Sequence, residues 1–201
     1  MNMLEGCSGR TLTGGLKWLN EPEEWSAGMD GLRIELRAKG DFFRPPAGEA
    51  NDDAHLLHAQ LHGDFTVAAA VAAVLANTFD AGGLMIRGSA DHWAKLCIER
   101  GVRGETKVVS VVTRLWSDDA DGVLLPEPKA WVRITRKGAL FGFHWSEDGR
   151  LWRFVRAFPL ELPPEVQVGV LAQAPRAPGG SVLFKALEYS EKPVGDFRSG
   201  E

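Results

Sequence analysis

The segment 141–154 most constrains the fold of this chain, because it combines a turn signal with alternating large side chains. The dipeptide Asp148-Gly149 favours a two-residue hairpin turn, in which glycine adopts a positive φ at little cost. Large residues flank the turn at the two-residue period of a strand: Phe141, Phe143, Trp145, Trp152 and Phe154. The sequence therefore predicts a tryptophan-bearing β-hairpin.

Further strand patterns run along most of the chain. The Ala-rich segment Phe65–Ala76 has some helix propensity, but its valines and its neighbours favour a strand. Glycine-rich or acidic segments, such as Ser117–Gly122, are expected to be turns. The remaining strands are expected at Leu32–Leu36, Leu56–Leu61, Ala81–Arg87, Trp93–Arg100, Lys107–Leu115, Ala130–Lys137, Gln167–Ala172 and Val182–Tyr189. Short strands separated by turn signals predict an all-β antiparallel β-sandwich or jelly roll.

The length of 201 residues suits one domain. We expect a flexible N-terminal lead-in over residues 1–15, the sandwich over 16–190 and a tail over 191–201. Cys7 and Cys97 are too few for a disulfide framework or a zinc site, so both are interpreted as free thiols. The N-terminus lacks the apolar core of a signal peptide and no apolar run approaches the length of a membrane span, so a cytoplasmic location without membrane contact is expected.

The net charge of -4 gives no electrostatic reason to expect a nucleic-acid partner. Seven Trp and ten Phe against one Tyr are unusual, and indole rings suit both a core and a stacking surface. Alternation places one set of polar and aromatic side chains on a common face, provided that the strands are neighbours in one sheet: Arg87, Trp93, Lys95, Glu99, Arg114, Trp131, Arg133 and His144. Such a face could bind a polar ring-shaped ligand, and the alternative is a solvated face with cross-strand ion pairs.

Two groups of residues raise the question of a metal. The first is the set His55, His58 and His62, which would form one face of a helix but is interrupted by leucines and is better read as a loop or strand surface. The second is the acidic turn with Asp118, Asp119 and Asp121. This turn could attract calcium, but it lacks the spacing of a recognised calcium loop. We therefore expect no metal site, with calcium at the acidic turn as the one cofactor left open.

Catalysis has little support in the sequence. A glycosidase needs two carboxylates at a defined separation, and Glu99 is the one mid-strand carboxylate on the expected face. The sequence shows no glycine-rich phosphate loop, nucleophile elbow or catalytic triad spacing.

An ordered set of short motifs resembles the regulation-of-enolase protein family, whose members are largely domains of unknown function. The set runs through Trp18-Leu19-Asn20-Glu21-Pro22-Glu23, Asp41-Phe42-Phe43-Arg44, Asp80 to Arg87, Trp93-Ala94-Lys95 with Glu99, Ser110-Val111-Val112-Thr113, and Ser146-Glu147-Asp148-Gly149 with Trp152. The resemblance covers residues 16–190. It implies a concanavalin A-like lectin/glucanase sandwich, and that superfamily implies glycan binding or cleavage by analogy of fold.

This chain departs from the family pattern in two places. The usual Asp-Gln-Ala-Gly stretch is Asp80-Ala81-Gly82-Gly83 here, and the segment Phe42 to Gly48 lacks the family's His and Tyr. If those residues line a family pocket, the pocket of this chain is altered or lost. The residues that match coincide with the polar face derived from alternation: Asp80, Arg87, Trp93, Lys95 and Glu99.

Together these patterns predict a non-catalytic module that binds a carbohydrate-like or other polar ligand on the concave sheet face. The expected ligand-binding residues are Asp80, Arg87, Trp93, Lys95, Glu99, Trp131, Arg133 and His144. One alternative is a glycoside-active enzyme that uses Glu99 as acid/base. The other is a regulatory domain that binds a protein partner through an apolar surface.

Overall fold

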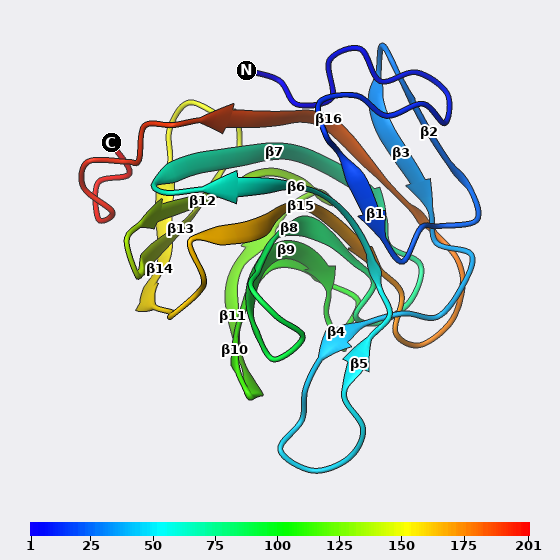
Figure 1. The fold of residues 1–201 in the computed structure, drawn as a ribbon. Helices are drawn as coiled ribbons and strands as arrows, with labels where there is room; N and C mark the ends of the chain where they lie inside the picture. The colour runs from blue at the N-terminus through cyan, green and yellow to red at the C-terminus, as the bar shows by residue number, and fades with distance from the viewer.

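The computed structural model describes residues 1–201 and is built of strands and loops alone. Two seven-stranded antiparallel sheets pack face to face, and a two-stranded arm lies below them in the view of Figure 1. This confirms the all-β antiparallel sandwich expected from the sequence. No helix of the structure is long and apolar enough to cross a membrane.

The first sheet, called the β9 sheet here, contains seven strands in the order β1-β6-β15-β8-β9-β10-β11. Their bounds are β1 (Lys17–Leu19), β6 (His55–His62), β15 (Glu165–Gln173), β8 (Ala81–Arg87), β9 (His92–Arg100), β10 (Thr106–Arg114) and β11 (Trp116–Leu125). Several of these strands match the expected bounds closely, and β8 matches them to the residue.

The second sheet, called the β12 sheet, has the order β14-β13-β12-β7-β16-β3-β2. Its strands are β14 (Arg153–Pro159), β13 (Leu140–Ser146), β12 (Lys129–Lys137), β7 (Phe65–Val74), β16 (Ser181–Ser190), β3 (Gly31–Glu35) and β2 (Trp25–Gly28). The Ala-rich segment is thus a strand, β7, at the centre of this sheet. The arm pairs β4 (Phe42–Phe43) with β5 (Asn51–Asp52).

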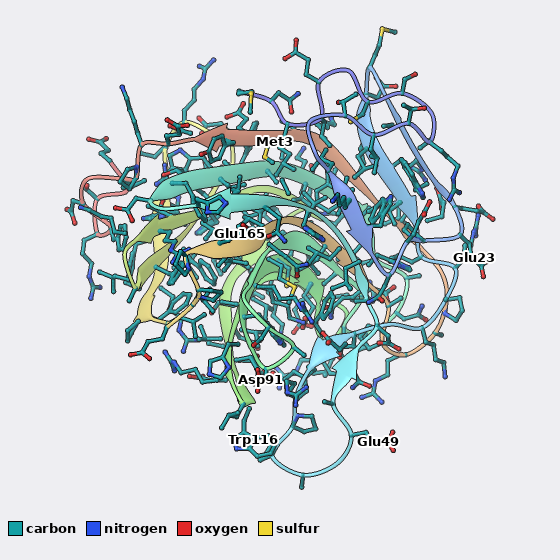
Figure 2. The ribbon with its side chains drawn as sticks, viewed as in Figure 1. Met3, Glu23, Glu49, Asp91, Trp116 and Glu165 are labelled. Carbon is teal, nitrogen blue, oxygen red and sulfur yellow. The ribbon has the colours of Figure 1, made fainter.

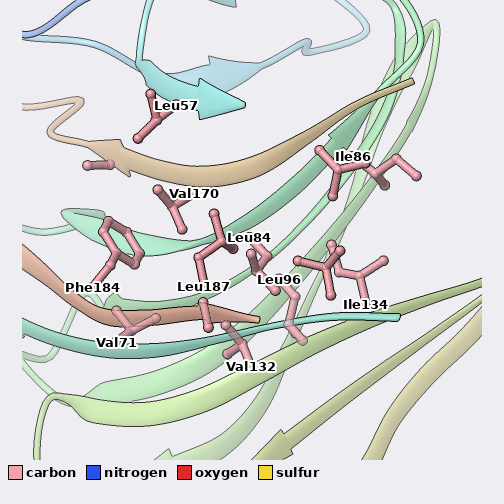
Figure 3. Close-up of a cluster of buried hydrophobic side chains, with 14 of the residues drawn as sticks. Leu57, Val71, Leu84, Ile86, Leu96, Val132, Ile134, Val170, Phe184 and Leu187 are labelled. Carbon is pink, nitrogen blue, oxygen red and sulfur yellow. The ribbon is translucent and has the colours of Figure 1, made fainter. Parts of the chain in front are cut away.

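The core between the sheets is a cluster of 39 buried residues. Figure 3 shows Leu84, Leu96 and Val170 from the β9 sheet close to Val132 and Phe184 from the β12 sheet. Alternation explains the arrangement, because every second side chain of a strand points to the same face. Each fully buried aliphatic or aromatic side chain contributes about 1.5–3 kcal/mol to folding.

The opposite face of the β9 sheet is also partly covered. A second cluster of ten buried residues lies there; Phe42 of the arm packs edge-on against Trp93, and Met85 and Cys97 of the sheet belong to the same cluster. As a result β9 is buried along nearly its whole length. The arm therefore encloses part of a face that would otherwise be solvated.

Two local predictions were wrong. The segment Ser117–Gly122 is not a turn: it is part of β11, which pairs with β10. The hairpin around Asp148-Gly149 has a longer connection than two residues, because the last pair of β13 and β14 is Trp145 with Arg153. The Asp148 carboxylate accepts hydrogen bonds from the backbone N–H groups of Arg150 and Leu151, at 2.9 and 3.1 Å, and this capping favours a wider loop.

Both ends of the chain pack on the sandwich. Near the N-terminus Met3, Leu4 and Cys7 are buried, and the N–H of Met3 donates to the Leu187 carbonyl of β16 at 2.7 Å. Figure 2 places Met3 beside β16. This packing differs from the loose lead-in expected from the sequence, because the apolar side chains of this segment reach the core. The domain boundaries at residues 16 and 190 stay predictions.

Candidate ligand-binding site

Lys95 and Glu99 lie on the outer face of the β9 sheet, as alternation predicted. The cross-strand register puts Lys95 opposite Val111 and Glu99 opposite Lys107, so these four side chains share one face. In Figure 1 the β9 sheet curves around this face, with β4 and β5 at its rim. We call it the concave face.

A cavity of about 210 Å³ opens on the concave face, between the arm, β9, β10 and β11. Its walls combine two phenyl rings, two valines and five polar side chains. The lining residues are Asp41, Phe43, Phe79, Lys95, Glu99, Val109, Val111, Asp119 and Gln173. An apolar wall with a few convergent polar groups is typical of a small-molecule site, and this one is small for its kind.

Lys95 anchors the arm to the sheet. Its side chain is only 2% exposed, and Nζ donates to the Phe42 carbonyl at 2.7 Å and to Gln173 Oε1 at 2.8 Å. Asp41 Oδ1 lies 3.5 Å from the same ammonium group. A buried ammonium needs such partners to offset its lost hydration. Lys95 therefore positions Asp41 and Gln173 in the pocket wall.

Glu99 is the pocket residue whose protonation is most altered. Burial raises the pKa of Glu99 to about 7, although the positive charges of Lys95 and Lys107 oppose the shift. The Asp121 carboxylate accepts a hydrogen bond from Lys107 Nζ at 2.5 Å and so offsets part of the Lys107 charge. No group of the protein makes a hydrogen bond to the Glu99 carboxyl group. Near neutral pH this group can therefore either donate or accept a hydrogen bond from a ligand.

Phe43 and Phe79 form the aromatic part of the pocket. Phe79 has a φ of 71°, in the left-handed region that costs a residue with a Cβ about 1–2 kcal/mol. Its N–H donates to the Arg100 carbonyl at 2.7 Å and its carbonyl accepts from Gln173 Nε2 at 3.2 Å. These bonds hold the strained backbone in place, and strain of this kind is concentrated at functional sites.

Neither phenylalanine was predicted to be a site residue. Phe43 belongs to the Asp41-Phe42-Phe43-Arg44 motif, and Phe79 immediately precedes Asp80. Their closeness to family motifs is the one sequence signal that could have indicated them. Alternation could not, because both residues lie outside the strands of the β9 sheet.

Trp93 and Asp80 are buried structural residues. Trp93 has no exposed surface, donates from Nε1 to the Ala90 carbonyl at 3.1 Å, and packs edge-on against Phe42. The prediction that Trp93 stacks on a ligand was therefore wrong. Asp80 accepts a hydrogen bond from the Asn77 N–H at 2.7 Å in the turn before β8, and burial raises its pKa.

Trp131, Arg133 and His144 lie on the β12 sheet, so the prediction that they share a face with Lys95 was wrong. Arg133 donates to the Gly200 carbonyl and His144 Nε2 to the Phe197 carbonyl, both at 2.7 Å. These two buried side chains therefore hold the C-terminal tail.

The physical reason for the error is that alternation tells which residues share a face within a strand, but not which sheet the strand joins. Arg114 differs too: it is on β10 of the β9 sheet, and its side chain donates to the Pro159 carbonyl of β14 at 2.6 Å. It therefore reaches toward the other sheet rather than the pocket.

The structure contains no group of three or more His, Cys, Asp and Glu side chains placed to hold a metal ion. The acidic residues expected in a calcium-friendly turn lie instead along β11, where pairing separates them. Asp118 bonds Arg156 of β14 at 2.7 Å, Asp121 bonds Lys107, and Asp119 lines the pocket. Among the histidines, His62 pairs with Glu165 at 3.0 Å.

Residues 18–192 match the family described as "Protein of unknown function (DUF1349)". The chain belongs to this family. It is also similar to Regulation of enolase protein 1 of Saccharomyces cerevisiae, with 28% identity over 169 residues that cover 83% of this chain and 85% of that protein. The family resemblance inferred from the motifs is thus confirmed.

Solved structures show the same fold. A functionally unknown protein from Saccharomyces cerevisiae superposes with a TM-score of 0.83 at 27% identity, over 90% of this chain and 98% of that one. The GH43 BlXynB protein of Bacillus licheniformis gives 0.73 at 12% identity, over 95% of this chain and 39% of that longer one. The carbohydrate binding module CBM66 of Bacillus subtilis gives 0.54 at 16% identity, over 88% and 95%. At these identities the two Bacillus proteins share the fold alone with this DUF1349 member.

Proposed function

We propose that the pocket between the arm and β9–β11 binds one ring of a carbohydrate-like ligand, without catalysing a reaction. The observation that carries the proposal is that Phe43 and Phe79 line the same cavity as Glu99, Asp41 and Gln173. A sugar ring has apolar C–H faces that pack on phenyl rings and hydroxyl groups that bond to carboxylates and amides. The pocket offers both kinds of contact within about 210 Å³.

The charges of the pocket restrict the ligand further. Three carboxyl groups line it, from Asp41, Glu99 and Asp119, against the single ammonium group of Lys95. Two of the three N–H groups of the Lys95 ammonium already donate to Phe42 and Gln173, and its charge faces Asp41 at 3.5 Å, so it has little capacity left for an anionic ligand. We therefore expect neutral or amino sugars to bind in preference to uronic acids, because like charges repel at close range.

Similarity of fold supports carbohydrate as the first ligand class to test, since one similar structure is a carbohydrate binding module. This is an analogy of fold and carries no residue across. The regulatory name of the yeast relative supports a protein partner as a further possibility.

A glycan-array screen of the purified protein tests the proposal, with Phe43→Ala as the pocket variant and Trp131→Ala as the matched aromatic control on the other sheet. Binding that is lost in Phe43→Ala and kept in Trp131→Ala supports the proposal. A blank array would contradict it. Loss of binding in Trp131→Ala alone would also contradict it, because the site would then lie on the β12 sheet.

Glycoside hydrolysis is a second candidate, favoured by the pKa of Glu99 near 7 and by the two further carboxyl groups of the pocket. A general acid is most effective with a pKa near the working pH. The discriminating experiment incubates the wild type and Glu99→Gln with an array-identified glycan. Turnover by the wild type that Glu99→Gln abolishes, with binding retained, would make the protein an enzyme.

An exposed apolar edge of the β9 sheet also supports a protein-interaction role. Four large apolar side chains are exposed along β11, the edge strand of the β9 sheet, and at the residue before it: Leu115, Trp116, Val123 and Leu124. Figure 2 shows Trp116 projecting from the lower edge of the molecule. If the array is blank, this edge is the surface to substitute before affinity purification of partners.

A further inference from the structure

A second group of polar side chains lies on the concave face, away from the pocket, across β8, β15, β6 and β1. Arg87, Gln167, His58 and Lys17 point to this face, as their registers show: Arg87 is paired with Gln167, and His58 with Lys17. None of the four lines the pocket around Glu99. Hydrogen bonds connect Arg87, Gln167 and His58 in one row with a defined direction, and Lys17 stands opposite His58 without joining it.

The chain of hydrogen bonds begins at Asp52 on the arm. Arg87 Nη2 donates to Asp52 Oδ2 at 3.2 Å, and Arg87 Nη1 donates to Gln167 Oε1 at 2.9 Å. The amide nitrogen Nε2 of Gln167 then lies 3.3 Å from Nε2 of His58. Because the amide nitrogen can only donate, Nε2 of a neutral His58 ring must accept.

This network sets the tautomer of His58. With Nε2 accepting, the proton of the neutral imidazole is on Nδ1, which makes Nδ1 a hydrogen-bond donor. Nδ1 is buried and has no partner, and the whole residue is only 6% exposed. A buried donor without an acceptor costs about 1–3 kcal/mol. The structure therefore holds an unsatisfied donor, His58 Nδ1, at the end of this row of hydrogen bonds.

His58 lines a notch of about 270 Å³ where β1 begins and the edge of β6 beyond it is free. The other lining residues are Gly14, Gly15, Lys17, Ala59 and Gln60. No carboxylate is among them. The N–H groups of Gly14 and Gly15 make no hydrogen bond within the protein, and both glycines have a positive φ, of 63° and 75°.

The electrostatics of the notch are positive. Burial lowers the pKa of His58, the neighbouring Ala59 backbone opposes this shift, and the charges of Arg87 and Lys17 lower the pKa further. Asp52 offsets part of the Arg87 charge, whereas Lys17 has no acidic partner. The notch thus combines an ammonium group with two free backbone N–H groups, and the buried His58 ring forms part of its wall.

We propose that this notch binds a small oxyanion, such as a carboxylate or a sulfate group. Free backbone N–H donors and an ammonium group in a site without carboxylates suit such a ligand. The inference is independent of the carbohydrate proposal, because the two sites share no lining residue.

The test is a titration of the ¹⁵N-labelled protein with sodium sulfate or sodium acetate, against sodium chloride at matched ionic strength. We expect saturable shifts of the Gly14 and Gly15 amide signals and of the His58 ring with sulfate, acetate or both, and none with chloride. Lys17→Met should weaken the binding roughly tenfold, the effect of losing one charge-assisted hydrogen bond. Lys39→Met, which removes an exposed lysine outside the notch, should leave it unchanged.

The two anions identify the class of ligand. Binding of sulfate alone indicates a tetrahedral oxyanion, and binding of acetate alone indicates a carboxylate. Shifts that do not saturate with either anion, or that equal those with chloride, would overturn the proposal. It would also be overturned if Lys17→Met and His58→Asn both bound as tightly as the wild type.

Discussion

Glu99 and Lys107 stand directly opposite each other on β9 and β10, on the concave face that holds the pocket. The register would suit an ion pair, yet the Lys107 ammonium group bonds Asp121 instead, at 2.5 Å. Glu99 is thereby left buried and without a hydrogen-bond partner. This arrangement gives the pocket a carboxyl group that changes charge near neutral pH.

The first prediction concerns the pH dependence caused by Glu99. Burial raises the pKa of Glu99 from 4.5 to about 7, so the unfolded chain loses this proton at lower pH than the folded protein does. The contribution of Glu99 to stability is therefore full below pH 4.5 and lost as pH rises through about 7. The shift corresponds to about 3 kcal/mol.

The variant Glu99→Gln cannot ionise, so its free energy of unfolding relative to the wild type should increase by up to about 3 kcal/mol across this pH range. Urea denaturation below pH 4.5 and above pH 7 measures the change. Glu161→Gln, at an exposed position, is the control and should show no such trend. A difference between Glu99→Gln and wild type that is constant with pH would contradict the burial of this carboxyl group.

The second prediction concerns His144, whose shift has the opposite effect on stability. Burial lowers the pKa of His144 from 6.5 to about 4, so the folded protein keeps the ring neutral. The contribution of the neutral His144 ring to the free energy of unfolding is full above pH 6.5 and is lost as pH falls through about 4. The amide of His144→Gln can still donate to the Phe197 carbonyl but cannot be protonated in this range. In this variant the decrease of about 3 kcal/mol in the free energy of unfolding at acid pH should therefore disappear. An unchanged acid limb of the denaturation profile would show that His144 is not buried in solution.

The third prediction concerns the attachment of the C-terminal tail. Phe197 is 7% exposed and packs on Gly142 of β13, where a Cβ atom would lie only 2.9 Å from the phenyl ring. Phe197→Ala should cost about 3 kcal/mol of stability by opening a cavity. Arg198→Ala removes a surface contact with the Phe154 ring and should cost about 0.5–1 kcal/mol. Equal effects of the two substitutions in thermal denaturation would indicate that the tail is detached.

The fourth prediction concerns backbone strain at Leu115, which joins β10 to β11 with a φ of 67°. Its side chain is half exposed, so Leu115→Gly removes the left-handed strain at the expense of little packing. We expect the free energy of unfolding of Leu115→Gly to exceed that of the wild type by up to about 1 kcal/mol. The control Leu124→Gly, at an exposed position within β11, should lose a similar amount. Two equally destabilised variants would argue against the strain.

Most of the fold could be predicted from the sequence, because alternation and turn residues are local signals. The strand Ala81–Arg87 was predicted to the residue, and Lys95 and Glu99 were assigned to the correct common face. The strand β11 was missed because its aspartates are rare in strands. Here their charges are offset by residues remote in sequence, such as Arg156, which alternation cannot identify.

The site was predictable only in part. Phe43 reaches the pocket because the arm folds back over β9, and Lys95 holds that arm through the Phe42 carbonyl. Trp131 was assigned to the same face because strands adjacent in sequence usually pair, whereas the chain changes sheet between β11 and β12. Contacts of this kind depend on topology rather than on local sequence.

The central claim is that the concave-face pocket binds a saccharide ring, and amide shift mapping of an array-identified glycan tests it most directly. On titration into the ¹⁵N-labelled wild-type protein, the largest shifts should fall on residues 41–43, Phe79, Lys95 and Glu99 that surround the pocket. Shifts grouped around Trp131 and His144 on the β12 sheet would contradict the claim.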